Sequence, residues 1–189
     1  MPTKLIALIA LALLSPQAIS SQHKSASLDA AEAVAELSLM QQEIDSATAP
    51  IKSRQQLQRY LSRTPEAPLH KLPDSAKRNF INSLIFTGKG LGSYSYLPLA
   101  DHLSATEIYQ TLSLFGVQSS TGVIPKLKAH TTVERSIMAR PTSDFCETPD
   151  SPLCQAGGGT KTDYICSSDP WDDKYSCTYS FGDICTKSC

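Results

Sequence analysis

The spacing of apolar residues predicts a helix most clearly between residues 104 and 116. Ile108, Leu112 and Phe115 recur at intervals of four and three residues, which places them on one helical face. Ser104 followed three residues later by Glu107 is a capping-box pattern, because each can hydrogen-bond the other's backbone N–H. This segment is therefore predicted to be a capped amphipathic helix that ends at the glycine of position 116.

A second helix is predicted immediately upstream, from Asp74 to about Phe86. Its apolar residues Phe80, Leu84 and Ile85 are expected to pack against the face just described. This helix pair is the predicted hydrophobic core. Weaker patterns predict an amphipathic helix over residues 27–46, short helices over 53–63 and 131–138, a proline-rich strap over 64–73, and a glycine-rich connection with a short strand over 88–96.

These elements predict a mostly α fold in two parts. Residues 21–140 form a small helical domain built on the central helix pair. Residues 141–189 form a disulfide-rich module dominated by loops, because glycine, proline, serine and aspartate crowd between its cysteines. Pro141 marks the predicted boundary.

The first 20 residues have the pattern of an export signal. Lys4 precedes an apolar run from Leu5 to Leu14, and small residues around Ala18 and Ser20 suit a cleavage site. The run is shorter than the ~20 residues that a membrane-spanning helix needs, and no later segment approaches that length. The chain is predicted to be secreted or periplasmic, with no transmembrane span.

All six cysteines lie in the last quarter of the chain. An even, clustered set in an exported protein predicts three disulfides, and six cysteines permit 15 pairings, among which the sequence does not choose. Their spacing does not match the close pairs of zinc sites, so neither a metal nor another cofactor is expected. The cysteines are Cys146, Cys154, Cys166, Cys177, Cys185 and Cys189.

The net charge of −1 hides an asymmetry between the two parts. Residues 21–140 contain 13 Lys and Arg against 10 Asp and Glu, whereas residues 141–189 contain 3 against 8. The basic stretch 52–78 and the acidic tail are opposite in charge and can contact each other. Glu66 and Asp74 interrupt the basic stretch, which favours a solvated surface over a nucleic-acid interface.

No set of residues matches a known catalytic pattern. Disulfide-bonded cysteines leave no thiolate, and the serines around Gly92 lack the GxSxG turn of a hydrolase. Asp101 and His102 are the best acid–base pair, but successive side chains usually diverge. We therefore expect no catalytic residues.

The region from residue 164 to 181 is the predicted binding site. It contains five aromatic residues beside several aspartates, and a small disulfide module has little core in which to bury them. The competing interpretation is that these rings cover the disulfides. The aspartates lack the spacing of a calcium loop. The predicted binding residues are Trp171, Tyr175, Tyr179, Asp172 and Asp173.

These patterns favour a secreted, disulfide-stabilised, non-enzymatic protein that binds a protein or carbohydrate. One alternative is a precursor, in which a helical pro-region escorts a C-terminal cysteine-rich peptide of toxin-like or antimicrobial type. Such a precursor would place all cysteines at one end, although Arg140 is followed by proline and makes a poor processing site. A small secreted hydrolase using His102 is the second alternative.

Overall fold

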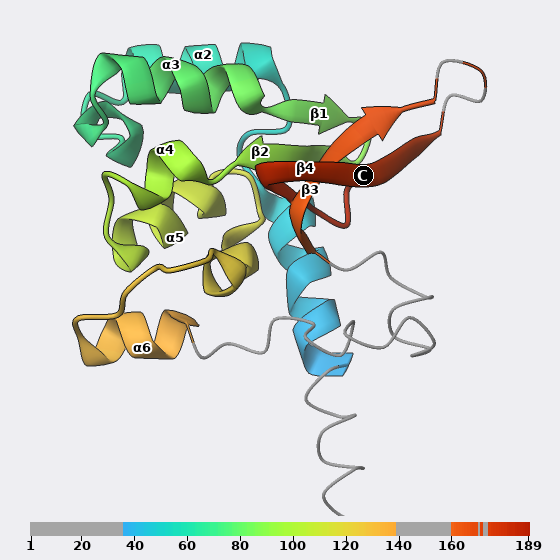
Figure 1. The fold of residues 1–189 in the computed structure, drawn as a ribbon. Helices are drawn as coiled ribbons and strands as arrows, with labels where there is room; N and C mark the ends of the chain where they lie inside the picture. The colour runs from blue at the N-terminus through green and yellow to red at the C-terminus, as the bar shows by residue number, and fades with distance from the viewer. Residues whose placement is uncertain (1–35, 139–159, 170, 172–173) are drawn as a thin grey trace, which may run out of the picture. The chain divides into compact units, whose positions relative to one another are not determined.

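The computed structural model describes residues 36–138, 160–169, 171 and 174–189. Along the chain, a group of helices precedes one pair of strands, and a second group of helices precedes a second pair of strands (Figure 1). After a helix over residues 36–48, the helices are α2 (Arg54–Arg63), η1 (Pro68–Lys71), α3 (Asp74–Ser83), α4 (Leu97–Ala100), α5 (Ala105–Ser113), η2 (Gln118–Val123) and α6 (Thr132–Met138). The strands are β1 (Ile85–Thr87), β2 (Gly90–Ser95), β3 (Lys161–Ser168) and β4 (Tyr175–Cys185).

The strands form one antiparallel sheet in the order β1-β2-β4-β3. This sheet shows that the predicted mostly α fold with a loop-dominated C-terminal module is wrong. The cysteine-rich region contributes the long hairpin β3–β4, and β4 pairs with β2 from the preceding region through Ser93↔Cys185 and Tyr94↔Ile184. Aromatic residues at positions 175, 179 and 181 and the β-branched residues Thr178 and Ile184 favour a strand in β4, despite the polar residues between them.

A second correction concerns the end of α3. The helix ends at Ser83 rather than near Phe86, and residues 85–87 form β1 instead. The glycine-rich segment, expected to be a connection between helices, forms the turn and strand of a β1–β2 hairpin. Gly90 has a positive φ of 129°, a conformation that glycine adopts without steric cost.

The capped helix is confirmed as α5. The Ser104 hydroxyl accepts a hydrogen bond from the backbone N–H of Glu107, and the Glu107 carboxylate accepts one from the N–H of Ser104. The predicted short helix over 131–138 is present as α6, and Thr131 and Glu134 form the same reciprocal pair of hydrogen bonds at its start.

The core lies where helices α3 and α5 meet the sheet. Phe80 of α3 contacts Phe115 edge-on with ring centroids 6.3 Å apart, which confirms the predicted packing of these two regions. Tyr94 of β2 contacts the same Phe80 ring at 6.2 Å. Its buried hydroxyl donates a 2.6 Å hydrogen bond to Ser120, whose own hydroxyl donates to a backbone carbonyl, and burial raises the pKa of Tyr94.

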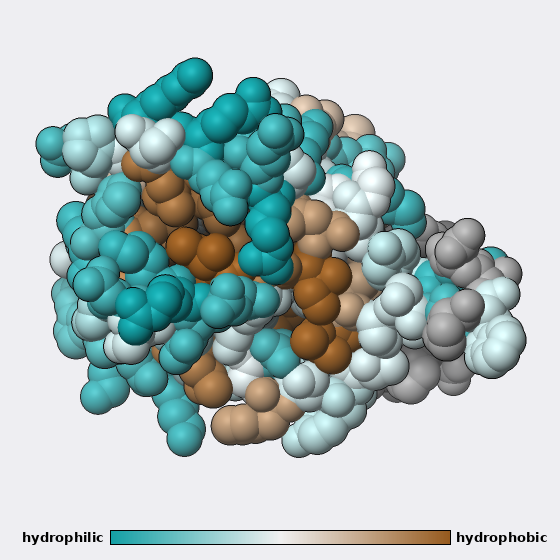
Figure 2. Space-filling view, turned by 90° about the horizontal axis from the view of Figure 1, so that it is seen from above, coloured by the Kyte–Doolittle hydropathy of each residue, from teal (hydrophilic) through white to brown (hydrophobic). Residues whose placement is uncertain are grey.

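The surface carries apolar residues beside polar ones. Figure 2 shows a band of apolar residues that remains visible between polar residues on the face of the molecule seen from above. Within the part of the chain that the structure describes, no helix is long and apolar enough to cross a membrane.

Candidate binding surface

The β3–β4 hairpin bends sharply part-way along its length. Cys177 and Cys185 lie eight residues apart in β4, which would separate their Cα atoms by about 26 Å in a straight strand. Their Cα atoms are 5.9 Å apart. On one side of the bend lies the arm, which we define as the described residues of the range 164–179. On the other side lies the base, which we define as residues 183–189 together with the neighbouring strands β1 and β2.

The bend falls at Asp163 and Gly182. Strand pairing passes from Thr162↔Ile184 to Tyr164↔Tyr179, so that one residue of β3 lies opposite four residues of β4. Asp163 and Gly182 have positive φ values of 61° and 88°, as expected where a bulge turns a strand. We call these two residues the hinge.

Hydrogen bonds hold the hinge to the base. One oxygen of the Asp163 carboxylate accepts from the backbone N–H of Gly182 at 3.0 Å and from the hydroxyl of Tyr96 at 2.9 Å. The Gly182 carbonyl in turn accepts from the Tyr96 N–H and the Ser95 hydroxyl. Burial, followed by the nearby Asp163 carboxylate, raises the pKa of Tyr96 to about 12. This hydroxyl therefore remains a donor at any physiological pH.

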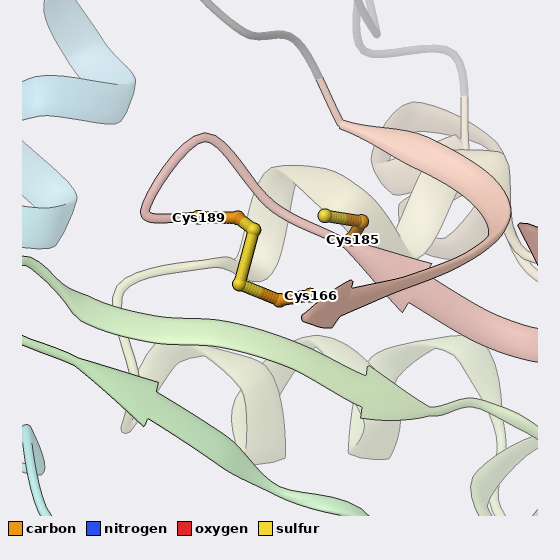
Figure 3. Close-up of side chains that lie close together, drawn as sticks. All are labelled: Cys166, Cys185 and Cys189. Atoms are coloured by element: carbon orange, nitrogen blue, oxygen red, sulfur yellow. A yellow bond between two sulfur atoms is a disulfide. The ribbon is translucent and has the colours of Figure 1, made fainter. Parts of the chain in front are cut away.

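Two disulfides connect the arm to the base. Cys166 pairs with Cys189 and Cys177 pairs with Cys185, which confirms the expectation of disulfides for these four residues. Cys146 and Cys154 lie outside the described residues. Gly92 of β2 lets the arm pack closely, because a Cβ there would lie 2.9 Å from the Cys166 sulfur. Figure 3 shows the sulfur atoms of Cys166, Cys185 and Cys189 gathered between the two segments.

The predicted aromatic residues are on the surface of the hairpin. Trp171 is 93% exposed, Tyr179 is 73% exposed and Tyr175 is 42% exposed. These three side chains therefore do not form a buried core around the disulfides. The predicted Asp172 and Asp173 lie outside the described residues.

Only part of this aromatic set is in mutual contact. Tyr164 and Tyr179 are cross-strand partners whose rings meet edge-on at 6.1 Å, and the Lys161 ammonium lies 5.5 Å from the centre of the Tyr164 ring. Among these described side chains, no ring contact joins Trp171 to Tyr175 or Tyr179. In the loop between β3 and β4, the backbone N–H of Trp171 donates a hydrogen bond to the Asp169 carboxylate at 2.9 Å.

Sequence reasoning missed Lys161, and it counted Tyr164 and Phe181 in the aromatic region without including them among the predicted binding residues. Lys161 and Tyr164 extend this aromatic surface along β3, and Phe181, 69% exposed, extends it toward the hinge. The spacing of aromatic residues along β4 was the available signal for a shared strand face, because residues 175, 179 and 181 are separated by even intervals. The position of Gly182 inside an aromatic strand pattern was a signal for the bulge.

The other sequence candidates do not assemble into a site. Asp101 and His102 are both exposed, whereas Ser93 is fully buried and the Ser95 hydroxyl donates to the hinge. The ion pairs that the described residues of the basic stretch 52–78 form are Lys71 with Glu107 and Lys77 with Asp74, the latter within one helix.

No protein-family model, curated protein or solved structure matches this chain.

Proposed function

We propose that this chain is an exported, disulfide-stabilised protein that binds a partner protein through the aromatic surface of its arm. The observation that carries the proposal is the exposure of Trp171, Tyr175 and Tyr179 on a hairpin tied to the base by two disulfides. Large exposed aromatic side chains are unfavourable in water, and tyrosine and tryptophan dominate the binding energy of protein interfaces.

The composition of the hairpin favours a protein as the ligand. Residues 161–181 combine tyrosines and a tryptophan with many serines and threonines. Binding loops of antibodies use the same combination, because tyrosine offers a large rigid contact and serine adapts its hydrogen bonds. The segment carries two lysines against four aspartates, so the partner surface is expected to be basic.

The tether between arm and base should increase affinity. A free two-stranded hairpin is at best marginally stable, and its ordering on binding would oppose association. The disulfides and the Asp163 hydrogen bonds fix the arm before a partner arrives. The arm is therefore organised to bind without a large loss of conformational entropy.

The test compares the wild-type chain with Trp171→Ala and Tyr179→Ala. Each protein captures partners from culture medium of the producing organism, and each captured protein is purified and titrated against all variants. A direct partner should bind the arm variants at least about tenfold more weakly, as expected for interface hot spots. Val133→Ala, which truncates an exposed side chain on α6, is the matched control and should bind as wild type does.

Equal affinity of wild type and both arm variants for every purified partner would overturn the proposal. Binding of a glycan panel that depends on Trp171, without any protein partner, would replace it with carbohydrate binding. Circular dichroism of each variant establishes that a loss of affinity does not come from unfolding.

Export is the second element of this proposal. Disulfides at Cys166–Cys189 and Cys177–Cys185 are compatible with an oxidising compartment. The leader lies outside the described residues. The intact mass of the product tests this element: a single species that begins at Ser21 supports it, whereas retention of Met1 to Ser20 contradicts it. A separate fragment cut between residues 139 and 160 would instead support the precursor alternative.

A further inference from the structure

The two disulfides of the arm lie against each other. The sulfur atoms of Cys166, Cys185 and Cys189 are all within 4.8 Å of one another, and the Cys185 sulfur is bonded to that of Cys177. Figure 3 shows the Cys185 sulfur pointing toward the Cys166–Cys189 bond. Four sulfurs from two disulfides therefore share one small volume.

A second pairing of the same four cysteines is geometrically close. Cys166 and Cys177 are directly opposed in the β3–β4 register, and cross-strand Cα atoms lie about 4.5–5.5 Å apart, within the range that a disulfide bridges. Cys185 and Cys189 are brought together because the Cys189 N–H donates to the Thr186 carbonyl and closes a turn. Pairing of Cys166 with Cys177, and of Cys185 with Cys189, requires little movement of the backbone.

The two pairings differ in what they connect. In the structure, both disulfides join the arm to the base. In the alternative, one disulfide lies within the arm and the other within the base. An exchange between them would remove both covalent links across the hinge, leaving the Asp163 and Gly182 hydrogen bonds to hold the arm.

We propose that this sulfur cluster is a thiol–disulfide exchange site that switches the arm between a tethered and an untethered form. The co-reactant is a thiol, either a small molecule or a protein, which acts as a catalyst and is regenerated. The proposal goes beyond the binding function and stands without it, because it concerns the links between arm and base and not the ligand.

Three exchanges complete the switch, and each forms one S–S bond as it breaks another. The external thiolate attacks the sulfur of Cys177, a partly exposed residue, and releases the Cys185 thiolate. Cys185 attacks the neighbouring Cys189 sulfur and releases the Cys166 thiolate. Cys166 attacks Cys177 across the strands and expels the external thiolate. No net oxidation or reduction occurs.

Disulfide mapping tests this proposal on the full-length protein. The protein is incubated in a mixture of reduced and oxidised glutathione, quenched with N-ethylmaleimide and digested without reduction by trypsin and chymotrypsin. Cleavage after Lys174, Phe181 and Lys187 separates the four cysteines. The expected result is the time-dependent appearance of Cys166–Cys177 and Cys185–Cys189 peptides. Their rate of formation should fall about tenfold per pH unit below the pKa of glutathione, because the thiolate is the nucleophile.

Two outcomes would overturn the proposal. One is the absence of the alternative peptides in native buffer, when the same treatment in urea produces them. The other is a native mixture that matches the urea mixture or includes bonds to Cys146 or Cys154, since either would indicate exchange through unfolding. The double variant Cys166→Ser/Cys177→Ser provides a second test: it should fold and form the Cys185–Cys189 disulfide, and two free thiols at these positions would contradict the inferred geometry.

Discussion

Two groups of aromatic residues in this molecule have opposite environments. Phe80, Tyr94 and Phe115 form the centre of the core and are almost completely buried, whereas Trp171 and Tyr179 on the hairpin are largely exposed. Burial of apolar area stabilises the first group. The second group gains little from burial, and its arm is instead held by disulfides and the hinge. Stability should therefore depend on the core group, and recognition on the arm group.

Truncating one ring from each group to alanine should give the largest difference in the free energy of unfolding. Phe80→Ala should lower the free energy of unfolding by about 3–5 kcal/mol, because it leaves a cavity against Tyr94 and Phe115. Trp171→Ala should change it by less than about 0.5 kcal/mol, as for other exposed sites. Urea denaturation followed by circular dichroism measures both. A comparable loss of stability in the two variants would show that the arm rings contribute to the core.

Substitution of the hinge glycine should give the next largest change in the free energy of unfolding. Gly182→Ala should lower the free energy of unfolding by about 1–3 kcal/mol, because alanine is strained at a φ of 88° and its Cβ would lie 2.6 Å from Leu97. Gly88→Ala is the matched control, since a Cβ there meets nothing within 4 Å. Urea denaturation compares the two variants. Equal stability would mean that the bend at Gly182 is not required by the fold.

Local signals in the sequence were sufficient for the helical core. The Ser104–Glu107 capping box fixed the start of α5, and apolar spacing identified the contact between Phe80 and Phe115. The capping box depends on residues within one helical turn. The contact between Phe80 and Phe115 joins two helical regions whose apolar faces can each be recognised from local spacing. The end of α3 was misplaced because Phe86 continues the apolar spacing of the helix but pairs with Leu91 in the sheet.

The arm could be predicted only in part. Aromatic residues in a small disulfide region indicated a surface, and the structure places Trp171 and Tyr179 there. The pairing of β4 with β2, which anchors the hairpin to the rest of the protein, could not be predicted. The two strands are separated by a long stretch of intervening chain, and their register depends on contacts between residues far apart in sequence. The positive φ of Asp163 is likewise a consequence of the bulge and not of its neighbours in sequence.

The smallest predicted effect is a change in the free energy of unfolding with pH. It should arise in the helical core region, at Glu107, and not in the disulfide-bonded arm. Glu107 caps α5 and pairs with Lys71 at 2.6 Å, and hydrogen bonds from Lys71 and the Ser104 backbone lower its pKa to about 2. The folded state thus holds this carboxylate ionised more strongly than the unfolded state does. The resulting stabilisation is complete above the ordinary pKa near 4.5 and is lost as the pH falls toward 2.

Glu107→Gln should therefore destabilise the protein by about 1–2 kcal/mol at pH 7, a range that allows for solvent screening of the exposed Lys71. The difference from wild type should shrink toward zero near pH 2. Asp74→Asn, which removes an exposed partner of Lys77, is the control and should cost less than about 0.5 kcal/mol. Thermal unfolding from pH 2 to pH 7 measures all three proteins. Because disulfides do not titrate, the arm should remain tied to the base over the whole pH range. If Glu107→Gln destabilises the protein equally at every pH, the role of Glu107 is in packing and not in charge.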